Sequence, residues 1–227
     1  MTTSDGWNAA VRDRLAPGRL LPLGTATDDA WITERAAREV LGRAAATVRG
    51  VVPGTLRIGP ADPEPEPEPE GSPQREPARE PGALRVSASF GLVAGRPLPE
   101  VVDELRAALF AAAGDGIGLV TAAVDLRVTD LLDAAPPKEG RAAPPQGGTS
   151  PTTDDPVALA ALGVTGVAAV TDALGPPVRR GSDGVRVEVA VTLGARPLDV
   201  ARAVRTAVTA ALPEEGAVTV VVSELRG

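Results

Sequence analysis

Two stretches of this 227-residue chain are similar enough to constrain its fold. Residues 82–92 read GALRVSASFGL and residues 183–193 read DGVRVEVAVTL, so both alternate apolar with other side chains. Alternation with a period of two predicts a β-strand with one buried face. After a short turn, Arg-Pro-Leu follows each stretch, at 96–98 and at 196–198. We therefore expect two related units.

An amphipathic helix is expected after each of these strands. Apolar residues recur there at the i, i+3, i+4 and i+7 spacing of one helix face. A glycine-bearing turn follows each helix, and a further alternating segment predicts a final strand at 120–128 and at 218–222. The first stripe comprises Leu98, Val101, Val102, Leu105, Ala108, Leu109 and Ala112, and the second comprises Leu198, Ala201, Val204, Val208, Ala211 and Leu212.

A helix and a short strand are expected upstream of each long strand. The first helix should run from Thr33, as its N-cap, to Val48, and the second should follow Asp155 and end within VTGV at 164–167. The predicted fold class is therefore α/β, with two tandem helix–strand–strand–helix–strand repeats, each an α+β sandwich unit in which helices cover a small sheet. The short strands are expected at 56–58 and 178–180.

The segment 60–81 is expected to be an extended, disordered hairpin loop inside the first unit. It contains eight prolines, seven acidic residues and two arginines, which gives it −5 of the net charge of −7. Alternating Pro and Glu favour polyproline II, because proline fixes φ and neighbouring carboxylates repel. The second unit has only a tight turn at the same place. The loop is either a solubilising spacer or an acidic ligand for a basic surface.

Four parts of the chain follow from these patterns. They are an N-terminal helix and connector at 1–28, a first repeat at 29–133, a flexible Pro/Gly-rich linker at 134–153 and a second repeat at 154–227. The N-terminal helix, from Ser4 to Leu15, contains Trp7 and either docks on the first repeat or recruits a partner.

Composition excludes most catalytic chemistry. The chain has no His, no Cys and no Tyr, which removes the usual ligands of zinc, iron and copper, thiol nucleophiles and the commonest general base. The acidic pairs Asp28–Asp29 and Asp154–Asp155 each precede an expected helix, so we interpret them as caps rather than acid–base groups. Lys138 lies in the linker, and the glycines at 114, 116 and 118 follow a helix, where they form a turn rather than a phosphate cradle. We expect no enzymatic activity, no cofactor and no metal.

Nucleic-acid binding is not expected either. The net charge is negative, aromatic residues make up only 2% of the chain, and neither repeat has a basic Gly-x-x-Gly loop. A KH-like nucleic-acid-binding module remains the alternative, because small α/β units of this size include RNA-binding folds.

Taken together, the motifs resemble those of the alkaline shock protein family of the bacterial envelope stress response. A helix ending in Val-x-Gly-Val, an alternating strand and a helix opened by Pro-Leu occur in the family's order in both halves. Abundant Ala, Arg, Gly and Pro with a single lysine is typical of a high-GC, actinobacterial genome. The matching segments are VTGV at 164–167, VRVEV at 185–189 and PLDVARAVR at 197–205, with ITE at 32–34, AAREV at 36–40, VRGV at 48–51 and PLPEV at 97–101 in the first copy.

The resemblance implies a non-enzymatic interaction or scaffold protein at the cytoplasmic side of the cell envelope. Its partner would be a protein, either a small membrane protein or a second copy, with no nucleic acid and no direct membrane insertion. The expected location is cytoplasmic, or peripheral to the inner face of the membrane through the partner. The two downstream helices differ in charge, −2 over 98–113 and +1 over 198–212, which indicates either two solvated faces or two faces that meet. The candidate interaction residues are Glu100, Asp103, Glu104, Arg202, Arg205 and Trp7.

Overall fold

The computed structural model describes residues 18–61, 83–134, 153–181, 184–212 and 216–227. Within these residues the fold is mixed α/β, with four α-helices and nine strands in a six-stranded and a three-stranded open sheet, neither of which closes into a barrel. The chain divides into two compact units, each built around one sheet. We name them the three-stranded unit and the six-stranded unit.

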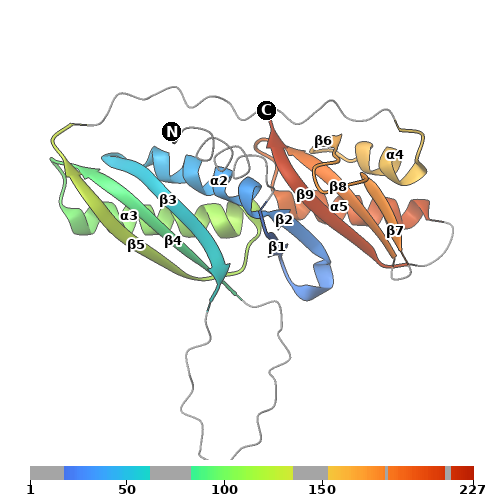
Figure 1. The fold of residues 1–227 in the computed structure, drawn as a ribbon, viewed down its shortest axis with the longest axis horizontal. Coiled ribbons are helices and arrows are strands. Elements are labelled where there is room, and N and C mark those ends of the chain that lie inside the picture. Colours follow the sequence, from blue (N-terminus) through green and yellow to red (C-terminus); the bar gives the residue numbers. More distant parts are fainter. Residues whose placement is uncertain (1–17, 62–82, 135–152, 182–183, 213–215) are drawn as a thin grey trace, which may run out of the picture. The chain divides into compact units, whose positions relative to one another are not determined.

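The three-stranded unit has β4 at its centre, antiparallel to β3 and parallel to β5. Helix α3 connects β4 to β5 and runs along one face of the sheet (Figure 1). Alternate residues of β4, among them Val86 and Phe90, are buried with Val101, Leu105 and Leu109 of α3. The elements are β3 (Val51–Pro60), β4 (Leu84–Val93), α3 (Leu98–Ala111), the π-helical segment η2 (Ala112–Ile117) and β5 (Thr121–Leu132).

Strand β3 is longer than the predicted 56–58 and is bent by a bulge. Its register against β4 shifts between Pro53 and Leu56. At the far end Pro60 pairs with Leu84, and the backbone N–H of Ala61 donates to the carbonyl of Ala83 over 2.8 Å. The Pro/Glu segment therefore connects two neighbouring antiparallel strands, as predicted, while its own conformation lies outside the described residues.

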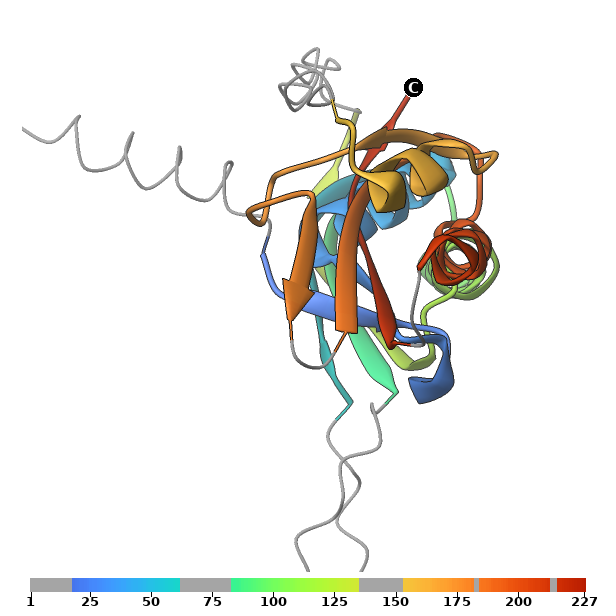
Figure 2. The same ribbon diagram turned by 90° about the vertical axis from the view of Figure 1, so that its right-hand side faces the viewer.

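The six-stranded unit repeats the arrangement around β8. Strand β8 is antiparallel to β6 and β7 and parallel to β9, and α5 connects β8 to β9 and covers one face of the sheet (Figure 2). The helix expected to end within 164–167 ends at Leu162, and β6, for which no strand was predicted, begins at Val167. The elements are α4 (Pro156–Leu162), β6 (Val167–Val170), β7 (Val178–Gly181), β8 (Gly184–Thr192), α5 (Pro197–Ala211) and β9 (Val218–Arg226).

Two strands from the start of the described chain complete this sheet. β1 (Leu20–Leu23) pairs antiparallel with β2 (Ala30–Thr33), and β2 runs parallel to β9, with Ile32 opposite Val222. The side-chain hydroxyl of Thr33 donates to the carbonyl of Ser223 over 2.6 Å. The predicted boundary at 28/29 therefore differs from the structure, because residues 18–23 and 29–39 cluster with the C-terminal segment and not with the rest of the first repeat.

Helix α2 (Glu34–Thr47) follows β2 directly. The backbone N–H of Ala36 donates to the Thr33 hydroxyl over 3.2 Å, so Thr33 caps the helix as predicted. Residues up to Glu39 cluster with the six-stranded unit, and residues from Val40 onward cluster with the three-stranded unit.

The two predicted apolar stripes are buried to different extents. Leu198, at the start of α5, is 4% exposed, whereas the corresponding Leu98 of α3 is 42% exposed. The prediction that Leu98 belongs to the core is therefore wrong. Helix α4 packs against α5 in the six-stranded unit. No helix in the described part of the chain is long and apolar enough to span a membrane.

Candidate interaction surfaces

The predicted acidic residues lie on the exposed side of α3. Glu100, Asp103 and Glu104 are all exposed. A side-chain nitrogen of Arg96 donates to Glu104 Oε2 over 2.8 Å, and Asp103 Oδ1 accepts from Arg106 over 3.0 Å. Exposed pairs of this kind contribute about 0.2–1 kcal/mol each, so they define the character of the surface more than its stability.

The predicted basic residues lie on α5 of the other unit. Arg202 is exposed and Arg205 is half-buried, one helical turn further along. Asp199, in the first turn, accepts from Arg196 over 3.1 Å. That the charged faces of α3 and α5 meet stays a prediction, and Trp7 lies outside the described residues.

One predicted cap is present at the start of α4. Asp155 Oδ1 accepts from the backbone N–H of Val157 over 2.9 Å, and both carboxylate oxygens accept from Arg180, over 2.7 and 2.9 Å. The hydrogen bond from Arg180 lowers the pKa of Asp155 below its usual 3.8, against the smaller opposing effect of burial. The carboxylate joins α4 to β7 in its charged form.

The prediction that the other acidic pair, Asp28 and Asp29, caps a helix is wrong. Asp28 ends the short 3-10 segment η1 (Ala26–Asp28), where its carboxylate accepts from the backbone N–H of Thr25 over 2.8 Å. Asp29 has a φ of 45° and accepts from the hydroxyl of Thr219 over 2.8 Å. The four residues of β2, Ala30–Thr33, separate this pair from the start of α2 at Glu34.

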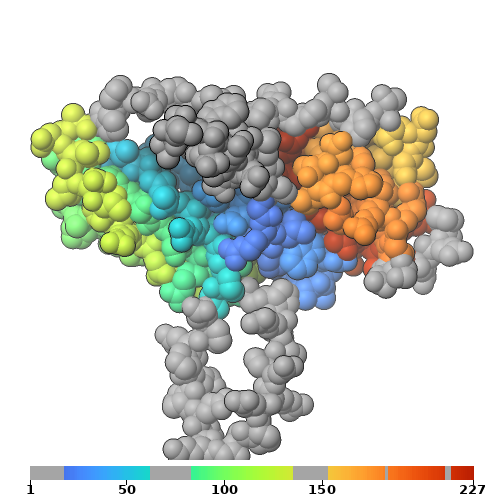
Figure 3. Space-filling view, viewed as in Figure 1, coloured from blue at the N-terminus to red at the C-terminus, as the bar shows by residue number. Residues whose placement is uncertain are grey.

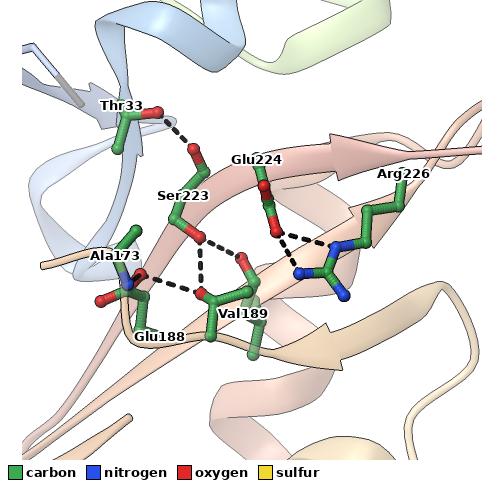
Figure 4. A network of polar contacts seen from close by, with 8 residues as sticks. Thr33, Ala173, Glu188, Val189, Ser223, Glu224 and Arg226 are labelled. Carbon is green, nitrogen blue, oxygen red and sulfur yellow. Dashed lines mark hydrogen bonds and ion pairs between the residues drawn. The ribbon is translucent and has the colours of Figure 1, made fainter. Parts of the chain in front are cut away.

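A buried carboxylate was not predicted, yet Glu188 of β8 is fully buried. Its Oε1 accepts from the Thr171 hydroxyl over 2.8 Å and from the backbone N–H of Ala173 over 2.9 Å. Its Oε2 accepts from the backbone N–H of Leu174 over 3.0 Å. Figure 4 shows the carboxylate beside the segment that carries Ala173.

Two hydroxyls extend this network toward the next strands. A hydrogen bond of 2.6 Å joins Thr171 Oγ1 and Ser223 Oγ, and the Ser223 carbonyl accepts from Thr33 (Figure 4). A buried carboxylate is stable only when it is hydrogen-bonded, and here both carboxylate oxygens accept hydrogen bonds from the chain itself. Glu188 therefore anchors the connection between β6 and β7.

Alternation misassigned Glu188 because it stands between Val187 and Val189. The pattern placed it on the solvent side of a one-sided strand, but residues 187–191 of β8 are buried on both faces. A carboxylate within a run of valines was the only available signal, and it does not distinguish a solvated face from a buried network.

The three-stranded sheet exposes the face that α3 does not cover. Figure 3 shows strands β3 to β5 reaching the surface on this side. Arg85 of β4 donates to Asp125 of β5 over 2.9 Å, and Arg57 and Arg127 lie exposed on the neighbouring strands. In register, Arg57 is opposite Ser87 and Arg127 is opposite Ser89, which places all four charged side chains on one face.

The described residues contain no group of three or more His, Cys, Asp or Glu side chains placed to hold a metal ion. Comparison of the chain with models of protein families, with curated proteins and with solved structures gives no match. The resemblance to the alkaline shock proteins thus rests on the sequence motifs and stays a prediction.

Proposed function

We propose that this protein is a non-enzymatic interaction module of the alkaline-shock envelope-stress type, built from two tandem repeats. The observation that carries the proposal is the pair of helices α3 and α5, each of which connects the central strand of its sheet to the parallel neighbouring strand. One presents Glu100, Asp103 and Glu104, and the other presents Arg202 and Arg205. Opposite charges on equivalent faces provide orientation and register for a bound protein more than they provide affinity.

The absence of the usual catalytic residue types supports this proposal. Glu188, the buried carboxylate, is satisfied by the chain itself, and Asp155 is engaged by Arg180 and the start of α4. We place the protein at the cytoplasmic side of the cell envelope, held there by a protein partner such as a small membrane protein.

The test is partner capture from native cells with membranes retained. Arg202→Glu combined with Arg205→Glu should lose the captured partner, because it reverses the charge of the α5 surface. Arg38→Glu with Arg49→Glu is the matched control, since it makes the same charge change at exposed positions in and after α2. An α5 variant that captures the same proteins as wild type would contradict the proposal.

A KH-like nucleic-acid-binding function is the second candidate. Arg57, Arg85 and Arg127 on the open sheet face are the observation in its favour, although Asp125 neutralises Arg85. Phosphate binding makes affinity fall steeply with salt. Binding of single-stranded RNA at low salt that disappears on Arg57→Glu would favour this function, and no binding at low salt would remove it.

A further inference from the structure

The four sheet edges of the described fold differ in how they are protected. Edge strands expose unpaired backbone groups, and proteins usually interrupt them with prolines, bulges or short length. Strand β3 contains Pro53 and Pro60 and a bulge, and β1 has four residues and contains Pro22. The edge beside β8 is made of two separate four-residue strands, β6 and β7. Each of these edges is a poor template for another strand.

Strand β5 is less protected than these edges. Its register against β4 shifts between Thr121 and Ala123 and between Val128 and Asp130, but residues 123–128 between these two irregularities pair without interruption. The strand is 12 residues long, contains neither Pro nor Gly, and among the described residues it pairs with β4 alone. Leu131, near its end, is 78% exposed. The equivalent strand of the six-stranded unit, β9, has β2 hydrogen-bonded along the corresponding edge. Among the described residues β5 is thus a long open edge, whereas the equivalent edge of β9 is occupied by β2.

We infer that β5 pairs antiparallel with β5 of a second copy of this chain, which joins two three-stranded sheets into one six-stranded sheet. A two-fold axis normal to the sheet keeps the helix-covered faces on one side, and it places residues opposite each other symmetrically about a central residue. With Leu126 at the centre, Asp125 of each copy lies opposite Arg127 of the other. Val124 lies opposite Val128 on the face that α3 covers.

Charge selects this register. Opposite charges placed directly across antiparallel strands stabilise the pairing, and like charges destabilise it. Centring the pair on Asp125 or on Arg127 would place that residue opposite its own copy. Centring it on Leu126 extends the intrachain pair of Arg85 and Asp125, 2.9 Å apart, into an alternating row of charges across both copies. The pattern Asp-Leu-Arg is complementary to itself in this one register.

Charge variants test the pairing by sedimentation of the full chain at high micromolar concentration. Wild type should be a dimer, and Arg127→Asp should raise its dissociation constant about tenfold or more, because each copy then sets Asp125 opposite another carboxylate. Mixing this variant with Asp125→Arg should restore association, since the two chains carry complementary charges. Arg57→Asp, on the other edge strand of the same sheet, is the matched control and should sediment as wild type.

The register has a separate test, because the chain contains no cysteine. Leu126→Cys should form an intermolecular disulfide under mild oxidation, since residues directly opposite across antiparallel strands have Cα atoms about 4.5–5.5 Å apart. Thr129→Cys, expected to be about 20 Å from its own copy, should not. Circular dichroism of each variant checks that the fold is retained.

A monomeric wild type would overturn the inference, and so would a dimer that is insensitive to Arg127→Asp and fails to cross-link at residue 126. The inference does not depend on the proposed function. The α5 variant used for partner capture leaves β5 unchanged, so loss of capture with a dimer intact, or the reverse, separates the two.

Discussion

The central strands β4 and β8 have the same neighbours in the same directions, but they are buried differently. In β4 the residues that face away from α3, Arg85, Ser87 and Ser89, are exposed or half-buried. In β8 the corresponding Glu188 and Ala190 are fully buried. In the six-stranded unit the connection from β6 to β7 contacts this second face, where the backbone N–H groups of Ala173 and Leu174 donate to Glu188.

A polar side chain on the sheet face away from the helix is exposed to solvent in one unit and buried in the other, where it must be hydrogen-bonded within the protein. In both units the antiparallel neighbour of the central strand is irregular, which leaves backbone N–H groups without a partner in the sheet. In both, a side chain of the central strand accepts a hydrogen bond from such a group. Ser89 Oγ accepts from the backbone N–H of Thr55 over 2.9 Å at an exposed site. Glu188 does the same for Ala173 and Leu174 inside the protein. An exposed hydroxyl thus accepts from the backbone N–H group in one unit, and a buried carboxylate accepts from the backbone N–H groups in the other.

The largest effect is expected at this position. Glu188→Ala should lower the free energy of unfolding by about 3 kcal/mol, because it leaves two backbone N–H groups without an acceptor and opens a cavity. Ser87→Ala, at the equivalent exposed position of β4, should change it by no more than about 0.5 kcal/mol. Urea unfolding of both variants measures the difference, and equal losses would mean that Glu188 is not a structural anchor.

A smaller difference in stability is expected between alanine variants of two glycines with positive φ, Gly50 and Gly166, which precede β3 and β6. Gly166 has a φ of 94°, and a Cβ there would lie 2.8 Å from Val200 Cγ2. Gly50 has a φ of 86°, and the nearest atom to its Cβ, the Val93 carbonyl oxygen, would be 3.7 Å away. Gly50→Ala should cost about 1 kcal/mol from backbone strain alone, and Gly166→Ala about 2–3 kcal/mol, because Val200 must also move. Thermal melts would contradict this if both variants lost the same stability.

The smallest expected effect is a difference in the pH dependence of stability between a charged N-cap, Asp155, and a neutral one, Thr33. Asp155→Ala should cost about 1 kcal/mol at neutral pH, and Thr33→Ala somewhat more, because the Thr33 hydroxyl also donates to the Ser223 carbonyl. The pKa of Asp155 is lowered in the folded chain by Arg180, so its contribution is complete above the unfolded value near 3.8 and is lost as the pH falls through the folded value. The cost of Asp155→Ala should therefore shrink in acid, while that of Thr33→Ala stays constant. Unfolding curves at both pH values would refute this if the two costs changed in parallel.

The regular elements of both units were predictable because each is specified locally. Period-two alternation located β4 and β8, and the apolar stripes located α3 and α5. Thr33 was predicted as the cap of α2, and its hydroxyl accepts from Ala36. Such patterns depend on neighbours within a few residues, which the sequence displays directly.

The candidate surface was predictable only in part. Amphipathic periodicity placed Glu100, Asp103 and Glu104 on the exposed side of α3, but it also placed Leu98 in the core. Exposure at a helix end depends on what packs against it, and that neighbour comes from elsewhere in the chain. The open edge of β5 and its self-complementary charges appeared only when strand order was known.

By itself the sequence determined two strand–helix–strand segments, the place of the Pro/Glu insertion and the lack of catalytic residue types. Only the tertiary structure decided that Ala30–Thr33 pairs with β9, nearly the whole chain away, and that Glu188 is buried beneath the connection between β6 and β7. A four-residue strand has almost no local signal, because its stability comes from the partner strand. A carboxylate's burial is likewise fixed by the groups that surround it, and those groups meet only when the chain has folded.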